Sequence, residues 1–326
     1  MAYLAGDIGG TKTHLSLVVE EKGKMVRVKD QKYPSQKYLN LRQIVKEFLK
    51  GESHEISKAC FGIAGPVKKR KSQATNLPWL LDCDVLEKEL HIEKVSLIND
   101  LEANAYGLNM LSEEEYYVLN AGDPDAKGNQ AMISAGTGLG EAGIFFDGKR
   151  HTPFACEGGH VDFAPRNALE DELLRYLRKK FGHVSYERIL SGPGLYNVYQ
   201  FVVETKKESE DLEILKEIQS GDSPRLISEK GESGRSKACV RTLEIFISIY
   251  GSEAGNTALK MLALGGVFIG GGIAPKILGA IKRGDFLSSF QGKGRFSELL
   301  GGIPIRVVLN DNTALLGSTY YAKHVM

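Results

Sequence analysis

The chain has 326 residues, of which 42% are hydrophobic and 25% are charged, and its formal net charge is +1. This composition is typical of a soluble globular protein, and the length favours two domains. A net charge near zero gives no electrostatic reason to expect nucleic acid or an anionic membrane as a partner, and uncharged runs such as residues 261–275 are too short to span a bilayer.

The first predicted elements are two strands joined by a glycine turn within residues 4–20. An apolar run ends at Asp7, turns through Gly9, Gly10 and Thr11, and continues with apolar residues at every second position. This period predicts a hairpin, without the helix that a dinucleotide fingerprint or a Walker loop requires. Its N–H groups and Thr11 can bind phosphate, and Asp7 can hold magnesium. An ordinary hairpin whose glycines only supply positive φ is the alternative.

A second candidate site lies where a predicted strand over residues 95–100 ends on Asn99 and Asp100 and a helix begins. Ligand groups gather at such carboxyl ends of strands, although Asp100 could serve only as the N-cap of the helix. The elements expected between the two sites are a strand over 24–34, a helix over 41–49 capped by Asn40, a strand over 58–67 and a helix over 84–91.

Residues 131–150 repeat the opening pattern of strand, glycine turn and strand. The turn contains Gly136, Thr137 and Gly138. A GxGxxG match begins at Gly138, but a strand follows it, so the pattern argues against a nicotinamide oxidoreductase. Two such hairpins predict a duplicated architecture in which each half presents one turn to a shared phosphate chain.

A third glycine cluster, made of Gly270, Gly271 and Gly272, follows an apolar run and precedes Pro275, which could open a helix. Other expected elements are a charged helix over 169–181, surface helices or a mobile connection over 204–237, a long helix or two helices broken near Gly251 or Gly255 over 237–264, and a strand, polar turn and final helix over 303–323.

Polar groups that could bind a second substrate lie between these turns. Glu157 and His160 share one short segment, and Glu187 follows in another. Each alone could be a surface acid or a half-buried histidine. With Asn99 and Asp100 they form a set rich in acceptors and poor in cations, which suits the hydroxyl groups of a neutral sugar better than a charged acceptor.

The four cysteines are scattered along the chain, at Cys60, Cys83, Cys156 and Cys239. None forms a CxxC pair, so neither a zinc site nor a disulfide framework is indicated. The chain also begins without a basic region followed by a cleavable apolar segment. We therefore expect reduced thiols and a cytoplasmic location.

Seven short segments occur in an order that resembles one known family. They are GDIGGT, GIAGP, INDLEA, AGTGLG, EGGHVDFAP, ERILSGPGL and GGVFIGGGI. Together they resemble the bacterial ATP-dependent glucokinase family of the sugar kinase, Hsp70 and actin superfamily, over essentially the whole chain. VDFAPRN replaces a cysteine-rich zinc motif of related kinases and repressors, which implies the zinc-free branch. Lys12 stands where the family more often has Asn.

The resemblance implies a two-domain α/β actin-like ATPase fold, of the ribonuclease H-like type, with a ligand cleft between the domains. Residues 1–110 plus 301–326 would form the small domain and residues 111–300 the large one, in a homodimer. The resemblance also assigns roles at matching positions. Magnesium and the phosphates would be contacted by Asp7, Gly9, Gly10 and Thr11, and the second phosphate turn would be formed by Gly136, Thr137 and Gly138. The adenosine would be bordered by Gly270, Gly271 and Gly272, and glucose would be bound by Asn99, Asp100, Glu157, His160 and Glu187.

The implied activity is transfer of the ATP γ-phosphoryl group to the 6-hydroxyl of glucose, at the entry to glycolysis. Asp100 would accept the hydroxyl proton, and Mg²⁺ would accompany ATP. A kinase for another hexose or an amino sugar is the nearest alternative. A non-catalytic sugar sensor is the other, although relatives that regulate transcription need an added helix-turn-helix segment, for which we expect no room before the first strand.

Overall fold

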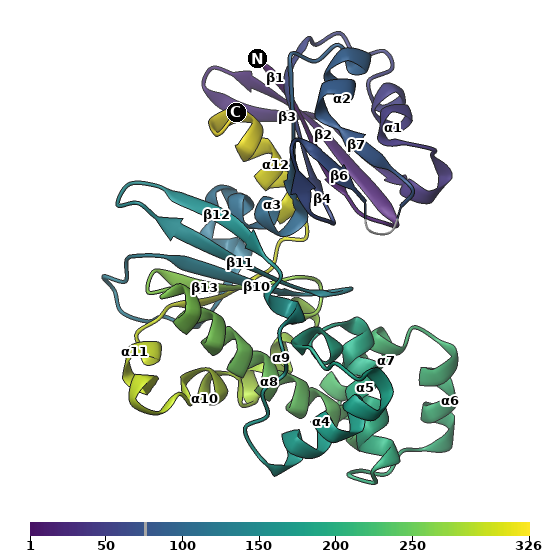
Figure 1. Ribbon diagram of the computed structural model, residues 1–326, viewed down its shortest axis with the longest axis vertical. Helices are drawn as coiled ribbons and strands as arrows, with labels where there is room; N and C mark the ends of the chain where they lie inside the picture. The colour runs from purple at the N-terminus through teal and green to yellow at the C-terminus, as the bar shows by residue number, and fades with distance from the viewer. Residues whose placement is uncertain (75–76) are drawn as a thin grey trace. The chain divides into compact units, whose positions relative to one another are not determined.

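The computed structural model describes residues 1–74 and 77–326. The chain divides into two compact units, each with its own sheet and helices (Figure 1). The first unit comprises Met1–Glu113 and Asn310–Met326, and the second comprises Glu114–Leu309.

The sheet of the first unit has five strands in the order β3-β2-β1-β4-β8. Their bounds are Ala2–Ile8 (β1), Lys12–Glu21 (β2), Lys24–Pro34 (β3), Ile56–Ile63 (β4) and Lys94–Asn99 (β8). β1, β2 and β3 form an antiparallel meander, whereas β1, β4 and β8 are parallel. The parallel strands therefore bring the ends of β1 and β8 to one edge of the sheet. A small separate sheet joins β5 (Val67–Lys68), β6 (Lys71–Gln73) and β7 (Leu80–Asp82).

Helices cover both faces of this sheet. α1 (Leu41–Phe48) and α2 (Cys83–Leu90) pack on the face that contains Leu4, and α3 (Asp100–Gly107) and α12 (Thr313–His324) pack on the face that contains Tyr3 (Figure 1). Adjacent residues of β1 thus point to opposite cores, as the period of a strand requires. The predicted N-cap of α1 is confirmed, since the Asn40 side chain accepts a hydrogen bond from Gln43 N.

The sheet of the second unit repeats the pattern of the first and adds one strand, in the order β12-β11-β10-β13-β14-β9. The strands are β9 (Tyr116–Asn120), β10 (Gln130–Ala135), β11 (Leu139–Phe146), β12 (His151–Cys156), β13 (Gly266–Gly270) and β14 (Ile305–Val308). The duplication suggested by the two glycine hairpins is therefore present in the topology. Because β14 pairs with β13 and β9, residues 301–309 lie in this unit, whereas the sequence predicts them in the first.

The long helix α8 (Lys237–Met261) runs along the second sheet without a break (Figure 1). Its glycines allow a close approach by α10 (Phe286–Gln291): a Cβ at Gly251 would lie 2.1 Å from Phe286 O, and one at Gly255 would lie 2.5 Å from Phe290 O. The single-helix alternative therefore holds. The other helices of this unit are α4 (Ala168–Phe181), α5 (Gly192–Glu204), α6 (Leu212–Ser220), α7 (Ser223–Glu232), α9 (Leu278–Arg283) and α11 (Ser297–Gly301).

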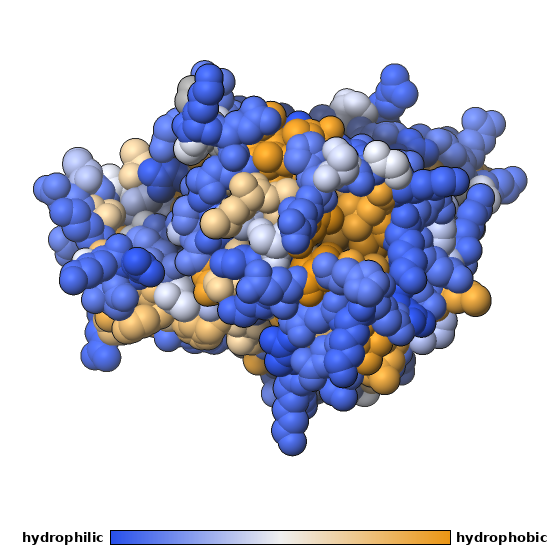
Figure 2. All heavy atoms as spheres, turned by 90° about the horizontal axis from the view of Figure 1, so that it is seen from above, coloured by the Kyte–Doolittle hydropathy of each residue, from blue (hydrophilic) through white to orange (hydrophobic). Residues whose placement is uncertain are grey.

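The charged stretch over residues 204–237 folds as α6 and α7, which supports the helical alternative for this segment. Figure 2 shows a face on which hydrophilic residues predominate and apolar residues lie between them. Within the described residues, no helix combines the length and the apolar character needed to cross a membrane.

Candidate active site

The first glycine turn, residues 9–11, is a tight hairpin between β1 and β2, as the sequence predicts. Gly9 N donates a hydrogen bond to Lys12 O at 2.9 Å. Ser35, just after β3, donates from its hydroxyl to Gly9 O at 2.8 Å and from its N–H to Thr11 O at 3.0 Å. Ser35 therefore fixes both ends of the turn to the residue that follows β3.

Glycine is needed in this turn for a reason other than φ. Neither Gly9 nor Gly10 is among the described glycines with positive φ, so positive φ is not what these glycines supply. A Cβ on Gly9 would lie 3.1 Å from Lys12 O, which is a tight contact. The absence of side chains instead leaves room for a ligand to approach the backbone.

Acidic residues meet at the edge of the first sheet beside this turn. Asp7 is the last residue but one of β1, and Asp100 begins α3 directly after β8. Burial and the charge of Asp100 raise the pKa of Asp7 to about 6, with Lys32 opposing them. Asn99 is the N-cap of α3 and accepts a hydrogen bond from Leu101 N at 2.9 Å. The alternative in which Asp100 is the cap is therefore wrong.

These carboxylates fit magnesium that is bound together with phosphates. Mg²⁺ commonly uses one or two carboxylates plus substrate phosphates instead of a complete protein cage. Among the residues that the structure describes, no group of three or more His, Cys, Asp and Glu side chains is placed to hold a metal ion by itself. A cation would relieve the repulsion between Asp7 and Asp100 that the raised pKa of Asp7 reports.

The second glycine turn, residues 136–138, lies beside the third glycine cluster, residues 270–272. Gly136 N donates to Gly138 O at 2.8 Å, and Gly192 N at the start of α5 donates to Gly136 O at 2.8 Å. β10 and β13 are parallel neighbours, and a Cβ on Gly271 would lie 2.2 Å from Ala135 O. The structure thus brings both predicted nucleotide segments of this unit together, with Thr137 exposed between the glycines of its turn.

Two residues that support this turn were not predicted as functional. The buried Tyr250 hydroxyl of α8 accepts from Ala135 N at 3.3 Å and lies 3.5 Å from Gly270 O, so it joins the ends of β10 and β13. The sequence signal is a tyrosine within an apolar helix, since a buried tyrosine hydroxyl needs a polar partner. Ser191 caps α5 through Gly194 N, a role that the segment SGPGL is typical of.

Glu157, His160 and Glu187 come together in the second unit. His160 belongs to the 3₁₀ turn η4 (Gly158–His160), and Glu187 to η5 (Tyr186–Arg188). His160 Nδ1 lies 3.9 Å from Glu187 Oε1, and its Nε2 lies 3.9 Å from Glu157 Oε2. Glu187 Oε2 also accepts from Leu139 N at 2.9 Å, so this acidic group is fixed to the residue that follows the second glycine turn.

We call residues 157–160, which include Glu157 and His160, the polar turn. It packs directly on β11 because its glycines have no side chains: a Cβ on Gly158 would lie 2.1 Å from Glu141 Oε2, and one on Gly159 would lie 2.1 Å from Leu139 O. Backbone hydrogen bonds also join the residues after the polar turn to those before Glu187, and they include Tyr186 N to Val161 O at 3.2 Å.

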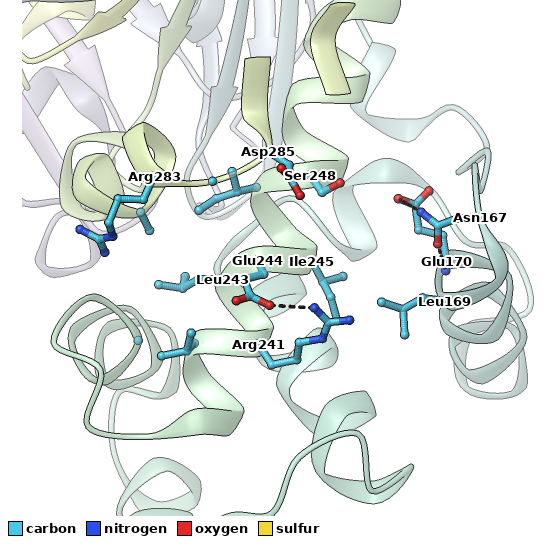
Figure 3. Close-up of a pocket in the computed structure, with 15 residues that line it drawn as sticks. Asn167, Leu169, Glu170, Arg241, Leu243, Glu244, Ile245, Ser248, Arg283 and Asp285 are labelled. Carbon is cyan, nitrogen blue, oxygen red and sulfur yellow. Dashed lines mark hydrogen bonds and ion pairs between the residues drawn. The ribbon is translucent and has the colours of Figure 1, made fainter. Parts of the chain in front are cut away.

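A separate pocket in the second unit has a cavity volume of about 520 Å³ and lies between α4, α8 and the segment around α9 (Figure 3). Of its described lining residues, none is a predicted site residue. Arg241 is paired with Glu244 at 2.7 Å, and Arg283 is paired with Glu232 at 3.1 Å. The arginines near this pocket therefore already have acidic partners, and the chemistry predicted from the sequence lies elsewhere.

The repeated sheets, a glycine turn in each unit and the acidic strand ends define a class: the protein has the two-domain α/β fold of actin-like, ribonuclease H-like ATPases, as found in sugar kinases. The Glucokinase family profile matches residues 4–325. The chain belongs to the glucokinase family.

Individual relatives agree with this assignment. A glucokinase of Trichormus variabilis is 42% identical over 339 residues, with 99% of each chain covered. The crystal structure of a glucokinase from an Antarctic psychrotroph is 30% identical with a TM-score of 0.85, and 98% of each chain is covered. The ROK family glucokinase of Streptomyces griseus, solved in complex with glucose and AMPPNP, is 20% identical with a TM-score of 0.65 over 99% of each chain, and it shares the fold.

Proposed function

We propose that the protein is an ATP-dependent kinase that phosphorylates glucose at the 6-hydroxyl and gives glucose 6-phosphate and ADP. Membership of the glucokinase family supports this assignment. The observation that carries it in the structure is the meeting of Glu157, His160 and Glu187 beside a glycine turn. Carboxylates and an imidazole bind hydroxyl groups, whereas a charged acceptor would require arginine side chains. His160 forms its described ion pairs with Glu157 and Glu187.

Asp100 is the proposed base. Its carboxylate accepts the proton of the 6-hydroxyl while the oxygen of that hydroxyl bonds to the γ-phosphorus, and the bond from this phosphorus to the bridging oxygen of ADP breaks. Asp100 is placed at the first turn of α3, where the helix dipole favours a negative charge. Because the transition state is loose, orientation of the hydroxyl supplies more of the acceleration than the base itself.

The phosphates are assigned to the glycine turns. Gly9, Gly10 and Thr11 would bind them from the first unit, and residues 136–138 from the second. Residues 270–272, which adjoin the second turn, would border the adenosine. Asp7 would hold Mg²⁺, which when bound neutralises charge on the phosphate oxygens.

Glucose is assigned to Asn99, Asp100, Glu157, His160 and Glu187. We further propose that the enzyme acts in the cytoplasm at the entry to glycolysis and forms a homodimer. The cysteines Cys60, Cys83, Cys156 and Cys239 are all free, which suits a reducing compartment. With a net charge of +1, neither a nucleic acid nor a membrane is expected among its partners.

The function is tested by the initial rate of ADP release from Mg-ATP with glucose, mannose, fructose, glucosamine, N-acetylmannosamine or no sugar. Strong stimulation by glucose alone supports the proposal, stimulation by another sugar overturns the specificity, and no stimulation overturns the kinase assignment.

The role of Asp100 is tested by Asp100→Ala, which should lower kcat by about 10² or more with little change in nucleotide affinity. Asp84→Ala is the matched control, since Asp84 also lies in the first turn of a helix, α2, and its side chain is exposed. Near-normal turnover of Asp100→Ala would remove this residue from the mechanism.

A further inference from the structure

Two acidic residues that the proposed chemistry does not use are buried in the second unit, and Glu141 lies against the polar turn. Glu141 on β11 is 1% exposed, and Glu253 on α8 is 0% exposed. The Thr257 hydroxyl donates to Glu141 Oε2 at 3.2 Å. Lys260 Nζ donates to Glu253 Oε1 at 3.0 Å. Glu141 Oε1 is buried without a hydrogen-bond partner in the described part of the chain. Glu141 Oε1 is therefore available to share a proton with the carboxyl group of Glu253.

Glu141 supports the polar turn directly. Its Oε2 lies 2.1 Å from the position that a Cβ of Gly158 would occupy, so the Gly158 backbone packs closely against the carboxyl group. The backbone carbonyl of Glu141 accepts from Cys156 Sγ at 3.2 Å, and Cys156 is the residue before Glu157. A change at this carboxyl group therefore acts on the backbone between Glu157 and His160.

Glu253 supports the other sugar segment. Burial, followed by the charge of Glu253, raises the pKa of the Tyr186 hydroxyl. Asn256 Nδ2 donates to both groups, at 2.7 Å to Glu253 Oε2 and 3.1 Å to the Tyr186 hydroxyl. Tyr186 immediately precedes Glu187. The two buried acids thus contact the supports of both segments that the proposed function assigns to the sugar.

The charge state of the pair depends on pH near neutrality. Burial, followed by the charge of Glu253, raises the pKa of Glu141 to about 7, against the effects of Lys260 and Thr257. A hydrogen bond between two carboxyl groups requires one proton, and loss of that proton leaves two like charges at close range. The other titratable groups that face the pair are Tyr250 and Lys260 from α8, Cys156 from β12, Tyr186 from η5, and Lys293 after α10.

We propose that Glu141 and Glu253 form a proton-sharing positioning pair, which holds the polar turn and Glu187 in the sugar-binding geometry and releases them when the proton is lost. Sugar affinity then falls as the pH rises, and nucleotide affinity falls by a smaller factor, because Glu187 also binds the residue after the second glycine turn. The identity of the ligand rests on the proposed function, but the response of the polar turn to the charge of the pair does not.

Glu141→Gln is the informative variant, because the amide can donate to Glu253 and its carbonyl can accept from Thr257, as a protonated Glu141 would. We would measure KM for glucose, KM for ATP and kcat from about pH 6 to about pH 8.5. In the parent protein KM for glucose should rise by about tenfold over this range, whereas in Glu141→Gln it should stay within about twofold of the acidic value.

Asp147→Asn is the matched control. Asp147 lies in the β11–β12 turn and is exposed, and hydrogen bonds from Arg150 N and Lys149 N lower its pKa, so it is ionised throughout the range. Its pH profile should follow that of the parent protein. Where Glu141→Gln does not fold, Glu253→Gln takes its place: an ionised Glu141 then faces a neutral amide instead of a second carboxylate, so no repulsion arises and the profile should again be flat.

A second measurement needs neither sugar nor ATP. Cys156 is half-buried, whereas Cys60, Cys83 and Cys239 are buried, so reaction of the native protein with an aromatic disulfide reports mainly on Cys156. We would compare the labelling rate of the parent protein with that of Glu141→Gln. The ratio of these two rates, the labelling ratio, should increase as the pH rises. Removing the Glu141 charge would by itself lower the pKa of Cys156 and speed labelling of the variant, which is the opposite direction.

The outcomes separate the two proposals. Parallel pH profiles for KM, or a labelling ratio that does not change with pH, would overturn the positioning pair. A purely structural pair would alter stability but would leave both of these readouts unchanged. If no sugar is phosphorylated by the parent protein, the proposed function fails, while the labelling ratio still decides whether the pair controls the polar turn.

Discussion

Replacing Gly158 with alanine tests the packing on which the polar turn depends. The new Cβ would lie 2.1 Å from Glu141 Oε2 and 2.7 Å from Glu141 Cδ, whereas ordinary van der Waals contact begins at 3.4 Å. The turn or the carboxyl group must therefore move by 3.4 − 2.1 = 1.3 Å. Because the Glu141 side chain is buried and accepts a hydrogen bond from Thr257 of α8, most of this movement falls on the polar turn.

A displacement of about 1 Å in a substrate-positioning segment can cost about 10² in rate, so kcat/KM for glucose should fall by about that factor in Gly158→Ala. KM for ATP should change little, because the polar turn is not assigned to the nucleotide. The overpacking should also lower the free energy of unfolding by about 1–3 kcal/mol. Coupled ADP release gives the first two quantities, and urea unfolding gives the third.

Two further variants decide whether the clash is the cause. Gly301→Ala is the control, since a Cβ there would be 3.9 Å from its nearest neighbour, Gln291 Nε2. It should leave kcat/KM unchanged and should not lower the free energy of unfolding, since alanine is the better helix former. Removing the carboxyl group in Glu141→Ala/Gly158→Ala takes away the two closest atoms, so the double variant should lose less than the sum of the single losses. Normal kcat/KM in Gly158→Ala, or strict additivity in the double variant, would refute this reasoning.

Two further glycine contacts and one half-buried lysine give three other predictions. Gly138→Ala would place a Cβ 2.5 Å from Glu187 Oε2, so KM for ATP and KM for glucose should both rise, as ADP-release titrations of each substrate would show. Gly317→Ala would place a Cβ 1.7 Å from Ala103 O between α12 and α3, and should lower the free energy of unfolding by about 2 kcal/mol or more in urea; an unchanged midpoint would contradict that packing. Burial, followed by the charge of Arg166, lowers the pKa of Lys293 from 10.5 to about 8. The unfolded chain therefore binds more protons over this range, and stability against urea should rise with pH more in the parent protein than in Lys293→Met.

Local patterns were sufficient to predict the hairpins and most of the strands. A period of two on either side of a glycine turn is visible in the sequence, and the two turns at residues 9–11 and 136–138 lie where it places them. The repetition of this pattern also anticipated the duplicated sheets. The pattern did not predict which residue is the N-cap of α3. Both Asn and Asp can cap a helix, and the sequence does not contain the backbone angles that select Asn99 over Asp100.

Features that depend on distant contacts could not be predicted. Gly251 and Gly255 suggested a break in α8 because glycine is a weak helix former, but the backbone of α10 occupies the space that side chains would fill. Likewise, Glu141 and Glu253 are 112 positions apart in the sequence (253 − 141), and both are charged residue types that are mostly exposed. Their burial together appears only once β11 and α8 are packed in the same unit.

Gly138 and Gly158 each leave space for a buried or half-buried carboxylate, and these carboxylates link the phosphate and sugar segments of the second unit. Neither Gly138 nor Gly158 is among the described glycines with positive φ, and each has a carboxylate oxygen where a Cβ would stand, from Glu187 and Glu141 respectively. Glu187 therefore lies on the phosphate turn as well as beside His160. A sugar that draws Glu187 into contact must also act on residues 136–138, so we expect the two substrates to bind with positive coupling, with KM for ATP falling as glucose approaches saturation.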